Sequence, residues 1–180
     1  MQQTGSDQNV DIDALKAQVD AEIAARLLLE ADYARFVHRR GFCIADMNLL
    51  VPLDAASEVT EMPPLFRLPG APPGVKGLAN RHGRVVPVLD LPAIFGRAHE
   101  WEAHTWLLVY GHGDEAIGLI IETLPERKMF APTDAADPAQ IEHPIAVYAR
   151  AAYREGNDLW IEPDMEGLFA AVFNVGTSSA

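Results

Sequence analysis

Six histidines are the first candidates for catalysis or metal binding in this sequence. They are His38, His82, His99, His104, His112 and His143. His99 and His104 are five residues apart, which places them about 140° apart around a helix, and no His-Glu-x-x-His spacing occurs. A metal site needs several ligands on one face, so we expect isolated histidines in turns or at the surface, and no metal site.

The other reactive side chains have no catalytic motif around them. The single cysteine, Cys43, lies in an apolar alternation, where a thiol behaves as a small buried hydrophobe. There is no Gly-x-Ser-x-Gly elbow and no Gly-Lys-Ser/Thr, and the Gly111-x-Gly113 pair lacks the third glycine of a dinucleotide site. Nothing selects a pair of carboxylates for acid–base chemistry. We therefore expect a protein-binding module with no catalytic residue and no cofactor, and keep a small β-barrel enzyme or ligand-binding protein as the alternative.

Length and charge narrow the class of protein. The chain has 180 residues and a net charge of -12, from 14 Lys and Arg against 26 Asp and Glu. A chain of this size buries enough surface to fold without a metal or disulfide. The excess of acid opposes binding to nucleic acid or anionic lipid. Because we find neither a leader pattern nor a run of 18 apolar residues, we expect a cytoplasmic protein without membrane insertion.

The N-terminal part predicts a flexible terminus followed by a helix. Residues 1–10 are polar and are expected to be flexible. From Asp11 to about His38, apolar residues recur every four positions, which predicts an amphipathic helix that Gly41 ends. Those apolar residues are Leu15, Val19, Ile23, Leu27 and Ala31.

The remainder predicts short strands joined by turns. Three hairpins are expected, over residues 42–53, 105–122 and 146–161. A strand over 84–89 contains Pro87, which suggests an edge or a bulge, and Asp90 can cap a short helix after it. Residues 63–73 are expected to be a connector, residues 131–144 a loop, and Asp164 the start of a terminal helix. Even strand spacing predicts a mainly β protein made of small antiparallel barrels.

One segment, residues 66–91, is more specific than any of these patterns. It reads FRLPGAPPGVKGLANRHGRVVPVLDL. This resembles the signature of the CheW-like family, in which a proline-bearing connector leads to Gly-hydrophobic-x-Asn-x-Arg-Gly and a strand with Pro-Val-hydrophobic-Asp-Leu. The residues that carry the motif are Gly77, Asn80, Gly83, Pro87 and Asp90. The resemblance extends over about residues 42–173.

The resemblance implies the fold and the function. Two packed five-stranded SH3-like barrels would occupy residues 41–176, preceded by a helical extension over residues 11–40. The chain would be a non-catalytic adaptor that couples methyl-accepting chemoreceptor tips to the regulatory domain of a CheA-type histidine kinase, recruited to membrane-associated receptor arrays. The leading helix and the Arg-Leu-Pro-Gly wording are similar to the adaptors of type IV pilus systems, which serve twitching motility.

The resemblance also implies a receptor-binding site. By position it would involve Ala56, Glu58, Val59 and His82, with Arg81 as a candidate replacement, because the family's Arg-Gly falls on His82-Gly83 here. On an extended segment, a shift of one residue turns the side chain to the opposite face, where Arg81 would miss the receptor. The alternative is therefore a family member that binds the kinase but not the receptors. For Ala56 and Val59 the alternative is core packing, and for the two motif glycines it is turn geometry.

Overall fold

The computed structural model describes residues 12–101 and 104–174, without the side chains at positions 29, 31, 32, 56, 57 and 174. The predicted flexible terminus, residues 1–10, lies outside the described residues. The chain divides into two compact units, residues 1–36 and residues 37–180.

The first unit contains helix α1 (Ile12–Tyr33). The prediction of a helix to His38 was wrong at its end, because strand β1 begins at Val37 and pairs with another strand from that residue onward. Gly41, the expected stop signal, lies inside that strand. Periodicity could not show this boundary, since the pairing partner of Val37 is Phe130, far along the chain.

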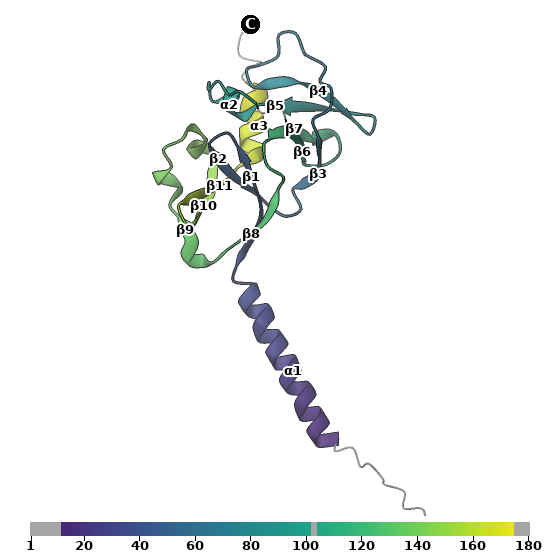
Figure 1. Cartoon of the computed structure of the whole chain (residues 1–180), viewed down its shortest axis with the longest axis vertical. Helices are drawn as coiled ribbons and strands as arrows, with labels where there is room; N and C mark the ends of the chain where they lie inside the picture. The colour runs from purple at the N-terminus through teal and green to yellow at the C-terminus, as the bar shows by residue number, and fades with distance from the viewer. Residues whose placement is uncertain (1–11, 102–103, 175–180) are drawn as a thin grey trace, which may run out of the picture. The chain divides into compact units, whose positions relative to one another are not determined.

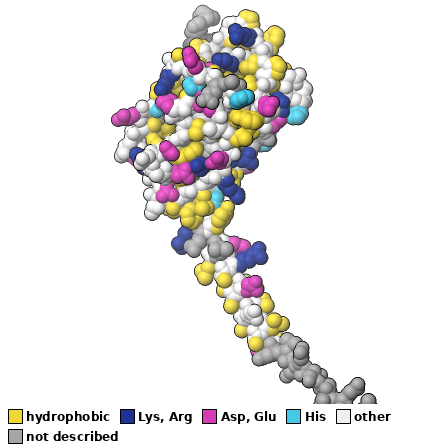
Figure 2. All heavy atoms as spheres, viewed as in Figure 1, with side chains coloured by type: hydrophobic (Ala, Val, Ile, Leu, Met, Phe, Trp, Pro, Cys, Tyr) yellow, Lys and Arg dark blue, Asp and Glu magenta, His cyan; other side chains and the backbone are white. Residues whose placement is uncertain are grey.

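The apolar stripe of α1 covers only its first turns. Arg26 and Glu30 form an ion pair of 3.1 Å between Nε and Oε1. At 100° per residue they fall on the same side of the helix as Val19, so charge interrupts the stripe. The large apolar side chains of α1 are exposed, as the yellow atoms in Figure 2 show. They are Ile12, Leu15, Val19, Ile23, Leu27, Leu28 and Tyr33.

The second unit is built on two sheets (Figure 1). The first sheet has the order β8-β1-β2-β11-β10-β9. Its strands are β1 (Val37–Ile44), β2 (Met47–Val51), β8 (Glu126–Phe130), β9 (Ala135–Ala136), β10 (Ala149–Glu155) and β11 (Asp158–Pro163). The edge strand β8 is held near β10 by Phe130, which stacks on Tyr153 at 4.8 Å, and by a 2.7 Å ion pair between Lys128 and Glu155.

The second sheet has the order β3-β6-β7-β5-β4. Its strands are β3 (Ala56–Glu61), β4 (Val75–Arg81), β5 (Arg84–Leu89), β6 (Trp106–Tyr110) and β7 (Ile117–Ile121). Pro87 was expected at an edge or a bulge. Strand β5 is not an edge, since it lies between β7 and β4, but its ladder with β4 has a bulge between Val75 and Gly77, opposite Leu89 and Val88. Proline is tolerated there because the parallel pairing of β5 with β7 involves only Val88 and Leu89.

Helices and 3-10 turns complete this unit. They are α2 (Leu91–Ile94), α3 (Met165–Asn174), η1 (Gly113–Glu115), η2 (Pro132–Asp134), η3 (Pro138–Gln140) and η4 (Pro144–Tyr148). The two sheets share one core: Phe42 of the first sheet, Leu119 of the second and Leu168 of α3 belong to the same buried cluster. In the described part of the chain, no helix is long and apolar enough to cross a membrane.

The mainly β class, with two sheets and a helix at each end, is confirmed. Several details differ from the prediction. Residues 131–144 contain two 3-10 turns and strand β9, so they are more than a loop, and the first sheet has six strands instead of five. Residues 146–148 belong to η4 instead of the expected strand. Strand β8 was not predicted, because its sequence ERKMF lacks apolar alternation.

Candidate functional site

The second sheet brings three predicted site residues together. Glu58 lies on β3, which is one edge of the sheet, and Arg81 ends β4, which is the other edge. His82 and Gly83 form a two-residue loop between β4 and β5, with φ of 52° and 80°. Positive φ at both positions is typical of a type I′ hairpin turn. The Asn80 side chain supports the loop by accepting a 3.0 Å hydrogen bond from the Gly83 amide.

Both basic side chains of this loop contact the same carboxylate. The Arg81 guanidinium forms an ion pair with Oε1 of Glu58, and Nε2 of His82 lies 3.5 Å from Oε2. The hydrogen bond from Arg81 holds the pKa of Glu58 below its ordinary value, with a further contribution from His82. We call Glu58, Arg81 and His82 the Glu58 cluster. The inference that a one-residue shift would turn Arg81 to the opposite face from His82 was wrong, because the chain leaves the extended conformation at His82.

The Glu58 cluster borders a hollow of about 350 Å³. Arg84 and His112 add polar groups to its lining, and Val86, Val109 and Ala116 give it an apolar floor. Glu58 and Arg81 retain 29% and 22% side-chain exposure, so a partner could still reach both charged groups. A charged group next to an apolar depression is suited to binding a protein surface.

The other two predicted contact residues are placed differently. Val59 is half-buried and packs against the main core, which matches the core-packing interpretation. The side chain of Ala56 lies outside the described residues, and its backbone pairs with Tyr110. Neither observation tests a role in partner binding.

The signature residues shape the hairpin and its exit. The turn-geometry interpretation holds for Gly83 but was wrong for Gly77, which lies inside β4. Gly77 has φ of 155°, and an added Cβ there would lie 2.7 Å from the backbone oxygen of Phe66, so glycine is needed for a close backbone approach. Asp90 is buried and caps α2 by accepting from the Ala93 amide at 3.2 Å. It also accepts from Nε1 of Trp101 at 3.0 Å and forms an ion pair with Lys76. The cap was predicted from sequence, whereas the Trp101 contact was not.

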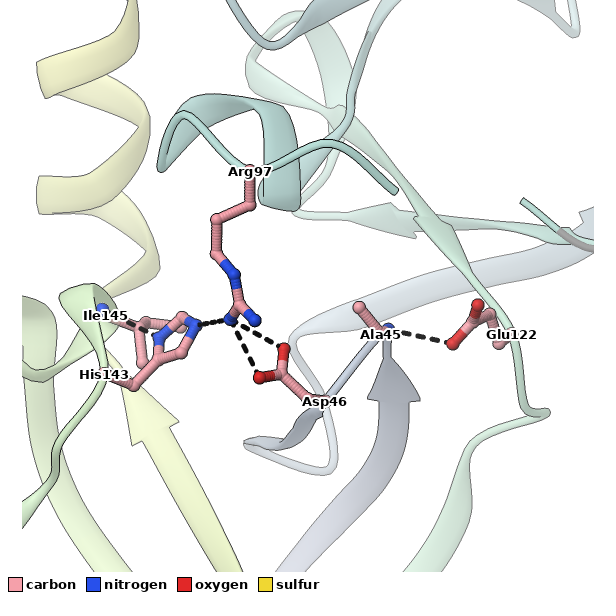
Figure 3. Close-up of polar contacts among 6 residues, drawn as sticks. All are labelled: Ala45, Asp46, Arg97, Glu122, His143 and Ile145. Carbon is pink, nitrogen blue, oxygen red and sulfur yellow. Dashed lines mark hydrogen bonds and ion pairs between the residues drawn. The ribbon is translucent and has the colours of Figure 1, made fainter. Parts of the chain in front are cut away.

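A second polar group surrounds the turn between β1 and β2 (Figure 3). Arg97 Nη1 donates to both carboxylate oxygens of Asp46 at 2.8 Å and lies 2.7 Å from Nε2 of His143. Nδ1 of His143 accepts from the Ile145 amide at 3.1 Å. A neutral imidazole accepts at one nitrogen only, so Arg97 and Ile145 compete for it. Sequence reasoning missed this group, because Arg97 is 51 residues from Asp46 and 46 from His143.

Charge and burial act in opposite directions on this group. Burial raises the pKa of Asp46, but the hydrogen bond and charge of Arg97 outweigh it and leave the pKa below the ordinary value. Burial lowers the pKa of His143. Glu122, which directly follows β7, accepts from the Ala45 amide at 2.8 Å and lies 2.6 Å from Nε2 of His99. These contacts hold the β1–β2 turn in place and offer no nucleophile.

The thiol of Cys43 has a partner on the neighbouring strand of the first sheet. Cys43 lies 3.1 Å from the Asn48 side-chain oxygen, which is a weak thiol hydrogen bond. Within residues 12–101 and 104–174, no three His, Cys, Asp or Glu side chains are grouped so that they could hold a metal ion.

The sequence model of the CheW-like domain matches residues 41–173, which is most of the second unit. The chain belongs to the CheW-like family. This confirms the resemblance found from residues 66–91. Members of the family are non-catalytic scaffold proteins, so the expectation that this chain is not an enzyme is also confirmed.

Two curated relatives fall on the two branches considered from the sequence. The chemotaxis protein CheW of Helicobacter pylori is 28% identical over 123 residues, covering 68% of this chain and 73% of that protein. Protein PilI of Pseudomonas aeruginosa is 31% identical over 114 residues, covering 63% and 62%. The scaffolding protein TtCheW of Thermoanaerobacter tengcongensis has a similar structure, with a TM-score of 0.65 over 73% of this chain and 86% of that one. At 17% identity this likeness shows the fold alone.

Proposed function

We propose that this CheW-like protein is an adaptor that couples methyl-accepting chemoreceptors to a CheA-type histidine kinase, in chemotaxis or in type IV pilus twitching motility. The observation that carries the proposal is the Glu58 cluster beside its apolar hollow. Residues 41–176 would form the adaptor domain and residues 11–40 an extension. The protein would reach membrane-associated arrays through its partners.

The Glu58 cluster supports a role in receptor binding. The ion pair fixes Arg81 and Glu58 across the two edges of the sheet, so the cost of ordering these side chains is met before a partner arrives. His82 is 78% exposed and stands at the tip of the hairpin, where it can meet a partner directly. Arginine is enriched at interface hot spots, which supports Arg81 as a receptor contact.

The pilus branch is favoured by sequence features outside the cluster. Helix α1 precedes the adaptor domain. A leading helix and the motif Arg67-Leu68-Pro69-Gly70 both resemble the adaptors of type IV pilus systems. The match to PilI is consistent with this branch. We propose the pilus system as the site of action, with Ala56 and Val59 as additional receptor contacts.

Calorimetry with the purified full chain tests the proposal. The titrants are the regulatory domain of the cognate kinase and the tip of the cognate receptor. We expect both to bind, and we expect Glu58→Arg to weaken receptor binding by at least about tenfold, since it reverses the central charge. Kinase binding by the same variant controls for folding, and Glu61→Arg, at an exposed position of the same strand, is the matched charge control.

Three outcomes are informative. If neither titrant binds wild-type protein at concentrations on the order of tens of micromolar, the adaptor function is wrong. If only the kinase binds, the protein is a family member that binds the kinase without receptors, which is the alternative raised by the Arg81-His82 order. If Glu58→Arg and Glu61→Arg weaken receptor binding equally, the receptor site lies elsewhere.

A further inference from the structure

A second depression lies between α3 and the hairpin formed by β6 and β7. It has a volume of about 620 Å³. We call it the α3 groove. Three of its lining positions, Gly111, His112 and Ala116, also line the hollow beside the Glu58 cluster, so the two depressions meet at the turn between β6 and β7. Their floors lie on opposite faces of the sheet, because Val109 lines the hollow and its neighbour Tyr110 lines the α3 groove.

The floor of the α3 groove is apolar. Tyr110 and Phe169 meet edge to face, with ring centroids 5.6 Å apart, and Ile117 lies beside them. Phe173, near the end of α3, is 39% exposed and extends the floor toward solvent. Burial raises the pKa of the Tyr110 hydroxyl, with the charge of Glu166 as the next cause. Phe169 is buried and Tyr110 is half-buried, so Phe173 supplies the exposed aromatic surface, which favours a protein partner.

The rim of the α3 groove is acidic. Asp114 and Glu115 come from η1, and Glu166 comes from the first turn of α3. No Lys or Arg lines the groove. Among the described residues, none of these three carboxylates has an ion-pair partner. The rim therefore carries negative charge that a basic partner would neutralise.

We propose that the α3 groove binds a helical segment of a partner protein whose apolar residues are flanked by lysine or arginine. The apolar side chains enter the groove and the basic ones reach Asp114, Glu115 and Glu166. This rests on the proposed adaptor function, and it specifies the chemistry of a partner segment that would bind across the β6–β7 turn from the Glu58 cluster.

The topology favours a helix over a strand. Strands β6 and β7 each have a neighbour on both sides in the sheet, so they offer no free edge for strand addition. The third boundary, α3, is a helix and presents only side chains. An occupant must therefore bind through side chains, as an amphipathic helix does in an apolar groove.

Helix α1 of the chain has the wrong charge for this groove. It contains five acidic residues, at positions 13, 20, 22, 30 and 32, against Lys16 and Arg26. An acidic helix would be repelled by an acidic rim. The chain itself is thus a poor source of the occupant, whether from the same copy or another.

Two synthetic helical peptides test the proposal against the full chain. They share a leucine face, flanked by lysine in one peptide and by glutamate in the other. In a fluorescence titration at low salt, we expect the lysine peptide to bind at least about tenfold more tightly. Its affinity should fall about tenfold in the double variant Glu115→Lys, Glu166→Lys, and should fall with added salt.

A matched double variant separates the groove from general charge. Glu61→Lys with Glu142→Lys changes the net charge equally at two exposed positions away from the groove, and we expect no more than about a twofold loss. Equal losses in the two double variants would overturn the proposal, as would equal binding of both peptides. Phe173→Ser should weaken the lysine peptide while circular dichroism shows the fold unchanged, and retained affinity in that folded variant would contradict the apolar contact.

The same proteins separate failure of this inference from failure of the proposed function. If the kinase domain and receptor tip both fail to bind but the lysine peptide binds at the groove, the adaptor function is wrong and the groove stands. If receptor and kinase bind normally to the groove variants and the peptide shows no preference, the groove inference is wrong and the function stands. Sedimentation of wild-type protein identifies a second copy as occupant if self-association is lost in the groove variant, which would also overturn the proposal.

Discussion

Replacing Glu58 by glutamine tests whether the Glu58 cluster closes the second sheet. The ion pair of Glu58 with Arg81 is partly buried. An exposed ion pair is worth about 0.2–1 kcal/mol, whereas disruption of a buried one costs about 3–5 kcal/mol, so the contribution of this pair should lie between these values. Its partner Arg81 is 22% exposed, and Nε of Arg81 is buried without a hydrogen bond. Glutamine keeps an oxygen that can accept from Arg81 but removes the negative charge of the pair, so we expect a loss of about 1 kcal/mol in the free energy of unfolding.

Urea unfolding at several pH values provides the assay. The folded-state pKa of Glu58 is depressed below its ordinary value of 4.5. Its stabilising contribution is therefore complete above the unfolded-state pKa and is lost as the pH falls through the folded-state pKa. We expect the stability difference between wild type and Glu58→Gln to be constant from neutral pH to about pH 5 and to shrink below it.

The control is Glu61→Gln, at an exposed position of the same strand, which should change the stability by no more than about 0.5 kcal/mol. A double-mutant cycle with Arg81→Met isolates the pairwise contribution, which should be about 1 kcal/mol. If the two glutamine variants are equally stable, or the difference does not change between neutral and acidic pH, the ion pair does not contribute to closing the sheet.

Two further predictions concern the signature residues. Asp90→Ala should lower the free energy of unfolding by about 2–3 kcal/mol, because the Trp101 indole and the Ala93 amide both lose their acceptor, and Asp90→Asn should lower it less; equal losses in urea unfolding would contradict this. Gly77→Ala should lower the free energy of unfolding by about 1–3 kcal/mol, because the added Cβ would meet the Phe66 oxygen. Gly156→Ala should lower it by about 1 kcal/mol, because Gly156 has a positive φ but open space around the added Cβ. Thermal unfolding that ranks the two variants in the opposite order would refute the close-contact argument.

Sequence reasoning worked where a local signal decides the structure. The turns at Gly111 and Gly156 have positive φ, as expected for glycine between apolar runs, and the hairpins around them were predicted. Helix α3 starts after Asp164, which accepts from the Gly167 amide at 3.2 Å, so the start signal is a true cap. Each of these features depends on residues within a few positions of one another.

Strands were missed where their partners determine them. β8 is exposed except for Phe130 and the half-buried Lys128, and it forms because β1 offers it a ladder from Val37 to Gly41. β4 contains a bulge between Val75 and Gly77 that breaks the alternation. The Asp46–Arg97–His143 contacts join segments about 50 residues apart. None of these leaves a periodic pattern in a single sequence.

The Arg81-His82 order shows why residue spacing alone does not predict the direction of a side chain, even when the motif is recognised. The rule that adjacent residues face opposite sides holds only within a strand. Here the strand ends at Arg81, and His82 adopts the left-handed conformation that the two-residue turn requires. Arg81 therefore reaches Glu58 from the end of the strand and His82 reaches it from the turn, on the two oxygens of one carboxylate. Arg81 thus places a positive charge at Glu58 although it stands one position before the family's arginine. The turn sets the direction of the His82 side chain, so both residues reach the same carboxylate.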